Sequence, residues 1–119
     1  MSKKALIYED DLVASMILEL ILQDQGYEVL DKKISADDLI GDVQNHAPDF
    51  ILLDVMLVGK KLGTEAASEL RQTSNLPILF MTALNDKDTL DHIQSLGNVI
   101  FVGKPYDQKL ISDALDKLL

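Results

Sequence analysis

The sequence predicts an α/β fold, a single doubly wound domain in which five strand–helix repeats build a parallel sheet covered by helices on both faces. Short uninterrupted apolar runs, such as Phe50–Leu53, are typical of strands that are buried on both sides. Segments with helically spaced apolar residues alternate with these runs, and right-handed crossovers then place helices on both faces. The 119 residues suffice for one core but hardly for two. We therefore expect one domain over residues 1–119.

The first two predicted strands differ in polarity. Ala5–Tyr8 is apolar throughout and indicates a buried strand. A helix is expected from Leu12 to Gln25, because its apolar residues are helically spaced and Gly26 is a typical C-terminal cap. Tyr27–Ile34 is the second strand, and its more polar composition favours a position at an edge of the sheet.

The second helix is expected to open at Ser35. Asp38 lies three residues further on, and this spacing resembles a capping box. Pro48 closes the helix, since proline lacks the backbone donor that a helix interior requires. The apolar face of this helix is modest and consists of Leu39, Ile40 and Val43.

The central strand, Phe50–Leu53, is followed by a loop over Val55–Leu62 and then by a helix from about Thr64 to Gln72. Leu76–Thr82 is predicted to be the fourth strand. It carries Pro77 near its start, where the loss of a backbone donor matters least. Both strands are apolar enough to lie inside the sheet.

The last two helices frame the fifth strand, Val99–Val102. Asn85 is expected to cap a short helix over Asp86–Leu96, which ends at Gly97. The final helix begins at about Asp107 and presents one apolar face, made of Leu110, Ile111, Ala114, Leu115 and Leu118.

The composition excludes several classes of function. The chain contains no cysteine, which excludes disulfides, thiolate metal sites and cysteine nucleophiles. Its formal net charge of −9 argues against direct binding of nucleic acid and is compatible with a cation site. The sequence shows no signal peptide and no apolar stretch of membrane-spanning length. We expect a cytoplasmic protein that does not enter a membrane.

Chemically active side chains follow four of the five predicted strands. Glu9 and Asp10 come after the first strand, Asp54 after the third, Thr82 at the end of the fourth and Lys104 after the fifth. If the first and third strands are neighbours, three carboxylates meet at one edge of the sheet. Two unit charges about 4 Å apart repel by about 4 kcal/mol near a protein surface. A cation would relieve that repulsion, and an all-oxygen ligand set suits Mg²⁺ or Ca²⁺.

Each of these residues also has a purely structural explanation. The acidic run Glu9–Asp11 is about equally well explained by a capped helix start, with Asp11 as the cap. Thr82 suits a strand, and Lys104 suits a solvated turn. Their occurrence together favours chemistry instead. A carboxylate nucleophile at Asp54 would form an aspartyl phosphate, and phosphoryl transfer needs mainly positioning and neutralisation of charge.

The combination of Glu9-Asp10, Asp54, Thr82-Ala83 and Lys104-Pro105 resembles the motif set of the response regulator receiver domain of two-component signalling, a family that includes chemotaxis regulators. The resemblance extends from Lys3 to Leu119. It implies a flavodoxin-like sheet of strand order 2-1-3-4-5, which sets the first strand beside the third. It also implies a cis peptide bond between Lys104 and Pro105.

The resemblance assigns roles to individual residues. Asp54 would be the phosphoacceptor and Lys104 the cation that contacts the phosphoryl group. Thr82 would be the switch hydroxyl, and Phe101 the aromatic residue that changes rotamer on activation. The implied cofactor is Mg²⁺, and its ligands would be Glu9, Asp10, Asp54 and the backbone carbonyl of Met56.

The loop after Asp54 departs from the family pattern. The family often has proline four residues past the acceptor, where this chain has Val58. An acid commonly precedes the glycine that Gly63 matches, and here that residue is Leu62. The loop is also one residue longer than the commonest form. These departures concern the conformation of the loop and its partners rather than the phosphorylation chemistry.

Three other functions match this sequence less well. A flavin carrier would need a donor-rich loop after the first strand, where acids 9–11 would instead repel a cofactor phosphate. A phosphatase with an aspartate nucleophile usually has paired acids on the first strand itself and a larger cap. The remaining alternative is a receiver-like binding module that acts without phosphorylation, although such proteins usually lack an acid, the acceptor or the lysine.

The first helix is more apolar than packing requires. On a helical wheel its expected core face consists of Val13, Ala14, Ile17, Leu18, Ile21 and Leu22. A ridge of residues spaced four apart extends the apolar surface beyond that face and consists of Leu12, Met16 and Leu20. We expect this ridge to dock the phosphodonor, a sensor histidine kinase or histidine phosphotransfer protein, or a second copy of the chain as a homodimer. The sequence leaves open whether an effector domain follows.

Overall fold

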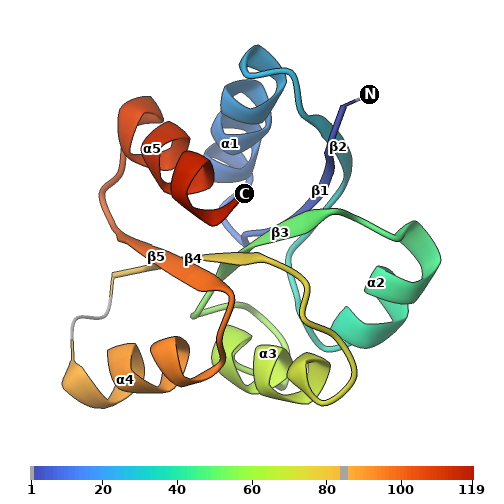
Figure 1. Ribbon diagram of the computed structural model, residues 1–119, viewed down its shortest axis with the longest axis vertical. Coiled ribbons are helices and arrows are strands. Elements are labelled where there is room, and N and C mark those ends of the chain that lie inside the picture. The colour runs from blue at the N-terminus through green and yellow to red at the C-terminus, as the bar shows by residue number, and fades with distance from the viewer. Residues whose placement is uncertain (1, 84–85) are drawn as a thin grey trace.

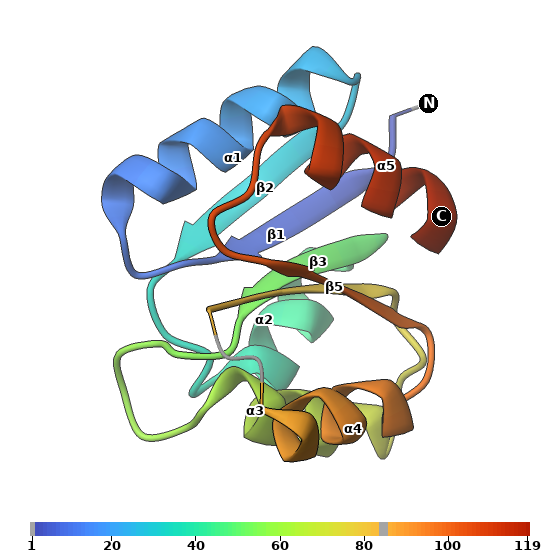
Figure 2. The same cartoon turned by 90° about the vertical axis from the view of Figure 1, so that its left-hand side faces the viewer.

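A five-stranded parallel sheet lies between two layers of helices (Figures 1 and 2) in the computed structural model, which describes residues 2–83 and 86–119. The strands are β1 (Lys4–Tyr8), β2 (Glu28–Lys33), β3 (Phe50–Asp54), β4 (Ile78–Thr82) and β5 (Val99–Gly103). The helices are α1 (Leu12–Asp24), α2 (Leu39–His46), α3 (Gly63–Arg71), α4 (Lys87–Ser95) and α5 (Gln108–Leu118). The sheet order β2-β1-β3-β4-β5 confirms the predicted order and sets β1 beside β3.

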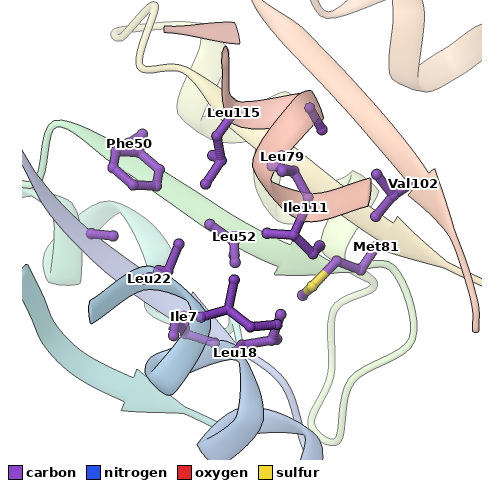
Figure 3. Packing of buried hydrophobic residues seen from close by; sticks show 13 residues of the cluster. Ile7, Leu18, Leu22, Phe50, Leu52, Leu79, Met81, Val102, Ile111 and Leu115 are labelled. Atoms are coloured by element: carbon purple, nitrogen blue, oxygen red, sulfur yellow. The ribbon is translucent and has the colours of Figure 1, made fainter. Parts of the chain in front are cut away.

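Two apolar clusters, one on each face of the sheet, form the core. Helices α1 and α5 cover one face, and α2, α3 and α4 cover the other (Figure 1). Ile7, Leu52 and Leu79 lie side by side across β1, β3 and β4 and point toward α1 and α5 (Figure 3). Their chain neighbours point to the opposite face, because side chains alternate along a strand. Burial on both faces explains why these strands are short continuous apolar runs.

Strand β2 lies at an edge of the sheet, as its polar sequence predicted. Its side chains are exposed or only half-buried, whereas β3 and β4 are buried along their whole length. Within the described ranges, none of the helices is long and apolar enough to cross a bilayer. The peptide bond between Lys104 and Pro105 is cis, which confirms that expectation.

Helix α2 begins at Leu39, so the prediction that it opens at Ser35 was wrong. The Asp37 amide donates to Ser35 Oγ at 3.1 Å, and the Asp37 carboxylate accepts hydrogen bonds from the loop after β3. These contacts hold residues 35–37 in a turn, so the helix begins only after them. Asp38 is the N-cap, but its side chain makes no capping hydrogen bond. The expected cap of the fourth helix, Asn85, lies outside the described residues.

The predicted core faces of two helices need correction. Val13 and Ile17 in α1, and Leu110 in α5, were expected inside and are instead exposed. Helix α1 carries apolar residues around most of its circumference, so their positions on a helical wheel do not identify the side that faces the sheet. The side that packs is centred on Leu18 and also includes Ser15, Ile21 and Leu22. In α5 the buried residues are Ile111, Ala114 and Leu115.

Candidate functional site

Three carboxylates meet where β1 and β3 leave the sheet. The two strands are paired in parallel, with Tyr8 opposite Leu53, so the residues that follow emerge at the same edge. Glu9, Asp10 and Asp54 each offer an oxygen atom within 4.8 Å of the others. Glu9 is only 1% exposed and Asp54 only 3%, whereas Asp10 is open to solvent. The predicted convergence of the three acids is thus present.

Lys104 joins two of these carboxylates. Its ammonium donates to Glu9 Oε1 at 3.1 Å and also to Asp54 Oδ2. Its backbone amide donates to the Thr82 carbonyl at 2.8 Å, which fixes the start of the turn after β5. Burial alone would lower the pKa of Lys104, but the hydrogen bonds to Asp54 and Glu9 outweigh it and hold the pKa above its usual value. The lysine therefore remains charged at neutral pH.

The donor set fits a hard divalent cation. Three carboxylates face one ammonium, so the local charge remains negative, and like charges this close repel in a partly buried site. All the side-chain donors are oxygens, which suits Mg²⁺ or Ca²⁺. The Met56 amide donates to Asp54 Oδ1 at 3.1 Å and so places the backbone of residue 56 next to the cluster. Glu9, Asp10, Asp54 and the backbone amide of Met56 thus lie together, and the metal-ligand roles that the resemblance implies for them stay predictions.

Thr82 and Phe101 lie on the two strands beyond β3. Thr82 ends β4, one residue past the partner of Asp54, and is buried. Phe101 lies on β5 opposite Phe80 and is half-buried against the cluster on the α2–α4 side of the sheet. The structure therefore brings Thr82 to the site through β4, while Phe101 lies on the adjacent strand.

The loop between β3 and α3 begins and ends against Asp54. The Gly63 amide donates to the Val55 carbonyl at 2.8 Å. A Cβ atom at Gly63 would lie 2.1 Å from the Asp54 carbonyl oxygen, so only glycine allows this approach. Sequence reasoning missed one contact of this loop, its attachment to Asp37. The one local sign of it was Gly59, because a turn with positive φ favours glycine.

The outer side of α1 is an apolar surface beside the acidic cluster. Leu12, Met16 and Leu20 are 73%, 51% and 60% exposed, which confirms that the predicted ridge is on the surface. Val13 and Ile17 widen it. A hollow lies on each side of the helix, and Glu9 lines both of them. One hollow includes Ile17 with Lys104, Pro105 and Tyr106, and the other includes Leu12 and Met16 with Lys32, Lys33 and Ile34.

The chain matches known proteins over nearly its whole length. Residues 5–116 match the family model of the response regulator receiver domain. The chain is 27% identical over 113 residues to the transcriptional regulatory protein PdtaR of Mycobacterium tuberculosis, covering 95% of this chain and 53% of that protein. It is 35% identical over 111 residues to YrkP of Bacillus subtilis, an uncharacterised transcriptional regulatory protein, covering 92% and 46%. It therefore spans about half the length of these curated relatives.

A solved structure agrees with this match. The signal receiver domain of a modulated diguanylate cyclase from Desulfovibrio desulfuricans superposes with a TM-score of 0.86 at 27% identity. The superposition covers 99% of this chain and 94% of that one. The likeness therefore includes all five strand–helix units.

The repulsion within the acidic cluster leads to a prediction about metal binding. In EDTA, Asp10→Asn is expected to raise the free energy of unfolding by up to about 1 kcal/mol, because it removes one of the like charges. Mg²⁺ at a hundredfold excess over its Kd should raise the free energy of unfolding of wild type by about 2.7 kcal/mol. The increase in the variant should be much smaller. Urea unfolding with EDTA and with Mg²⁺ measures both effects. Glu28→Gln removes the same charge at the far end of β2 and is the control. An undiminished Mg²⁺ effect in Asp10→Asn would exclude Asp10 as a ligand.

Proposed function

The chain belongs to the response regulator receiver domain family, and on that premise we propose that it is a signalling switch phosphorylated on Asp54. The observation that carries the proposal is the buried Asp54 carboxylate, which touches the Lys104 ammonium and lies within 4.8 Å of Glu9 and Asp10. The proposed donor is a phosphohistidine of a sensor histidine kinase or a histidine phosphotransfer protein. The receiver domain is taken to span residues 1–119 and to act in the cytoplasm.

The proposed reaction moves one phosphoryl group. A carboxylate oxygen of Asp54 attacks phosphorus, the new O–P bond forms, and the P–N bond to the donor histidine breaks with its electron pair returning to the imidazole. The Met56 amide on Oδ1 and Lys104 on Oδ2 hold the carboxylate in one orientation. Lys104 neutralises charge on the phosphoryl oxygens. Mg²⁺, when held by Glu9, Asp10, Asp54 and the Met56 carbonyl, supplies further positive charge there.

Phosphorylation is proposed to act by shifting a conformational equilibrium. The phosphoryl oxygens attract the Thr82 hydroxyl, and the space that it leaves lets the Phe101 ring turn inward. A modification shifts such an equilibrium only by its differential interaction with the two states. The half-buried position of Phe101 on the neighbouring strand supports this role, because its ring is not locked inside the core. The protein catalyses only its own phosphorylation and dephosphorylation.

The apolar ridge of α1 is the proposed docking surface for the phosphodonor or for a second copy of the chain. Leu12 and Met16 line one of the hollows that Glu9 lines, so a protein seated there would reach the edge of the sheet where Asp54 lies. Exposed apolar residues in register are unusual on a helix surface and mark contact sites. Met16 suits such a surface, because its side chain is flexible.

The acceptor assignment predicts that acetyl phosphate adds one phosphoryl group in the presence of Mg²⁺ and none in EDTA. Asp54→Asn should abolish the addition, because the amide is not a nucleophile of comparable strength. Intact-mass spectrometry measures it directly. Undiminished uptake by Asp54→Asn would refute the assignment. A wild-type chain that accepts no phosphoryl group would instead favour the receiver-like binding module.

The switch assignment predicts that Thr82→Ala accepts the phosphoryl group but responds to it less. NMR shift changes on β4 and β5 after phosphorylation should be smaller than in wild type, because the hydroxyl that couples the two strands is absent. Mass spectrometry confirms equal phosphorylation of the two samples. If the shift changes on both strands persist at full size, Thr82 does not carry the coupling.

The docking assignment predicts that Met16→Lys slows transfer from the cognate kinase by about tenfold or more, since a charge replaces a central apolar contact. If the partner is a second copy, sedimentation should instead show a shift from dimer to monomer. Labelling by acetyl phosphate should not change. Leu119→Lys alters another exposed apolar residue and is the matched control. If kinase transfer and sedimentation both match wild type, the ridge does not dock a partner.

A further inference from the structure

The middle of the loop between β3 and α3 is hydrogen-bonded to a residue in the turn between β2 and α2. Asp37 lies in the turn before α2, and its carboxylate accepts hydrogen bonds from two consecutive amides of the loop. The Lys60 amide lies 2.9 Å from Asp37 Oδ1 and 3.1 Å from Oδ2, and the Lys61 amide lies 3.0 Å from Oδ1. The Lys60 amide hydrogen bond holds the pKa of Asp37 below its usual value, so Asp37 is ionised at neutral pH.

The backbone conformation of Gly59, directly before these amides, allows this contact. Gly59 has a φ of +108°, a conformation that residues with a side chain rarely adopt. A Cβ atom on Gly59 would also lie 2.7 Å from both Asp37 Oδ2 and Ser35 Oγ. Ser35 Oγ in turn accepts the Asp37 amide at 3.1 Å. The turn at Gly59 therefore brings the loop against the Ser35–Asp37 segment with both amides facing the carboxylate.

The attachment lies close in sequence to the part of the loop that faces the acceptor. The Met56 amide donates to Asp54 Oδ1 at 3.1 Å, and Met56 is four residues before Lys60. Further along, Gly63 is tied to the Val55 carbonyl. Two other side chains hold the end of the loop: the Leu62 amide donates to Glu65 Oε1 at 2.9 Å, and Lys61 Nζ lies 2.6 Å from Glu69 Oε2 in a partly exposed ion pair of a kind that usually contributes little. Leu57 packs, half-buried, against the apolar cluster on the α2–α4 side of the sheet, and Asp37 is the side chain that holds the amides of residues 60 and 61.

We propose that Asp37 is a positioning residue for the phosphorylation site, acting through Lys60 and Lys61 to restrain the loop that presents Met56. This role rests on the proposed function, since it deepens the account of the same site. Without Asp37 the Met56 carbonyl is less often in position to bind a cation.

The test compares Asp37→Ala with Asp38→Ala in the intact chain. Asp38 is the next residue, carries the same charge, and makes no capping hydrogen bond with its side chain. Asp37→Ala should weaken Mg²⁺ binding about tenfold, the lower end of the loss that follows removal of a residue that orients a metal ligand. Asp38→Ala should stay within about twofold of wild type, because it controls for the loss of charge alone. Calorimetric titration with Mg²⁺ gives the affinities.

Two further measurements separate positioning from charge. Asp37→Asn keeps an oxygen able to accept from both amides, so its Mg²⁺ affinity should fall between those of wild type and Asp37→Ala. Amide hydrogen exchange of Met56, followed by NMR without metal, should be faster in Asp37→Ala and unchanged in Asp38→Ala. Gly59→Ala displaces the same contact with Asp37 intact and should reproduce the faster exchange.

Equal Mg²⁺ affinity and equal Met56 exchange in wild type and Asp37→Ala would overturn the positioning role. So would equal losses of affinity in Asp37→Ala and Asp38→Ala, because the effect would then be one of charge. Either result leaves the proposed function intact as long as Asp54→Asn abolishes phosphoryl uptake. Conversely, a chain that takes up no phosphoryl group fails the proposed function, while the exchange of Met56 still decides whether Asp37 restrains the loop.

Discussion

The repulsion among Glu9, Asp10 and Asp54 is the constraint on which the site depends. The parallel pairing of β1 with β3 forces their following residues to the same edge, and burial of Glu9 and Asp54 reduces the screening by water. Lys104 offsets part of this repulsion and is itself placed by the hydrogen bond from its amide to Thr82. The fold thus holds a charge imbalance that a bound cation or a rearrangement can relieve. A site of this kind responds to a change of charge more strongly than a neutral one.

The parts of this structure that sequence could predict are those set by local pattern. Phe50–Leu53 is apolar and short, so burial on both faces follows from its composition, and the residue after it must lie at the edge of the sheet. The order of the strands did not follow from any pattern and came from the family resemblance. Given that order, the meeting of Asp54 with Glu9 followed from the parallel register of β1 and β3, whereas Lys104 reaches both carboxylates from beyond β4 through its long side chain.

The predictions that failed depend on which surface of a helix meets the sheet, or on contacts distant in sequence. Val13 and Ile17 were placed inside because α1 is apolar nearly all round, whereas the side that packs against the sheet is centred on Leu18. Ser35 was assigned to a helix by a local capping pattern. In the structure it belongs to a turn that Asp37 holds against amides 23 and 24 residues further on. Gly59 indicates a turn at that point of the loop, but no local pattern identifies Asp37 as its partner.

The placement of the apolar α1 surface has a physical consequence for signalling. The surface lies beside Glu9 in both adjoining hollows, so a partner seated on it covers the edge where the carboxylates meet. Covering that edge removes water, which strengthens the repulsion among the acids and the attraction of Lys104 for an incoming phosphoryl group. The proposed docking surface and the proposed acceptor are therefore complementary neighbours. The first supplies affinity that does not depend on charge, and the second gains strength from the exclusion of water that docking produces.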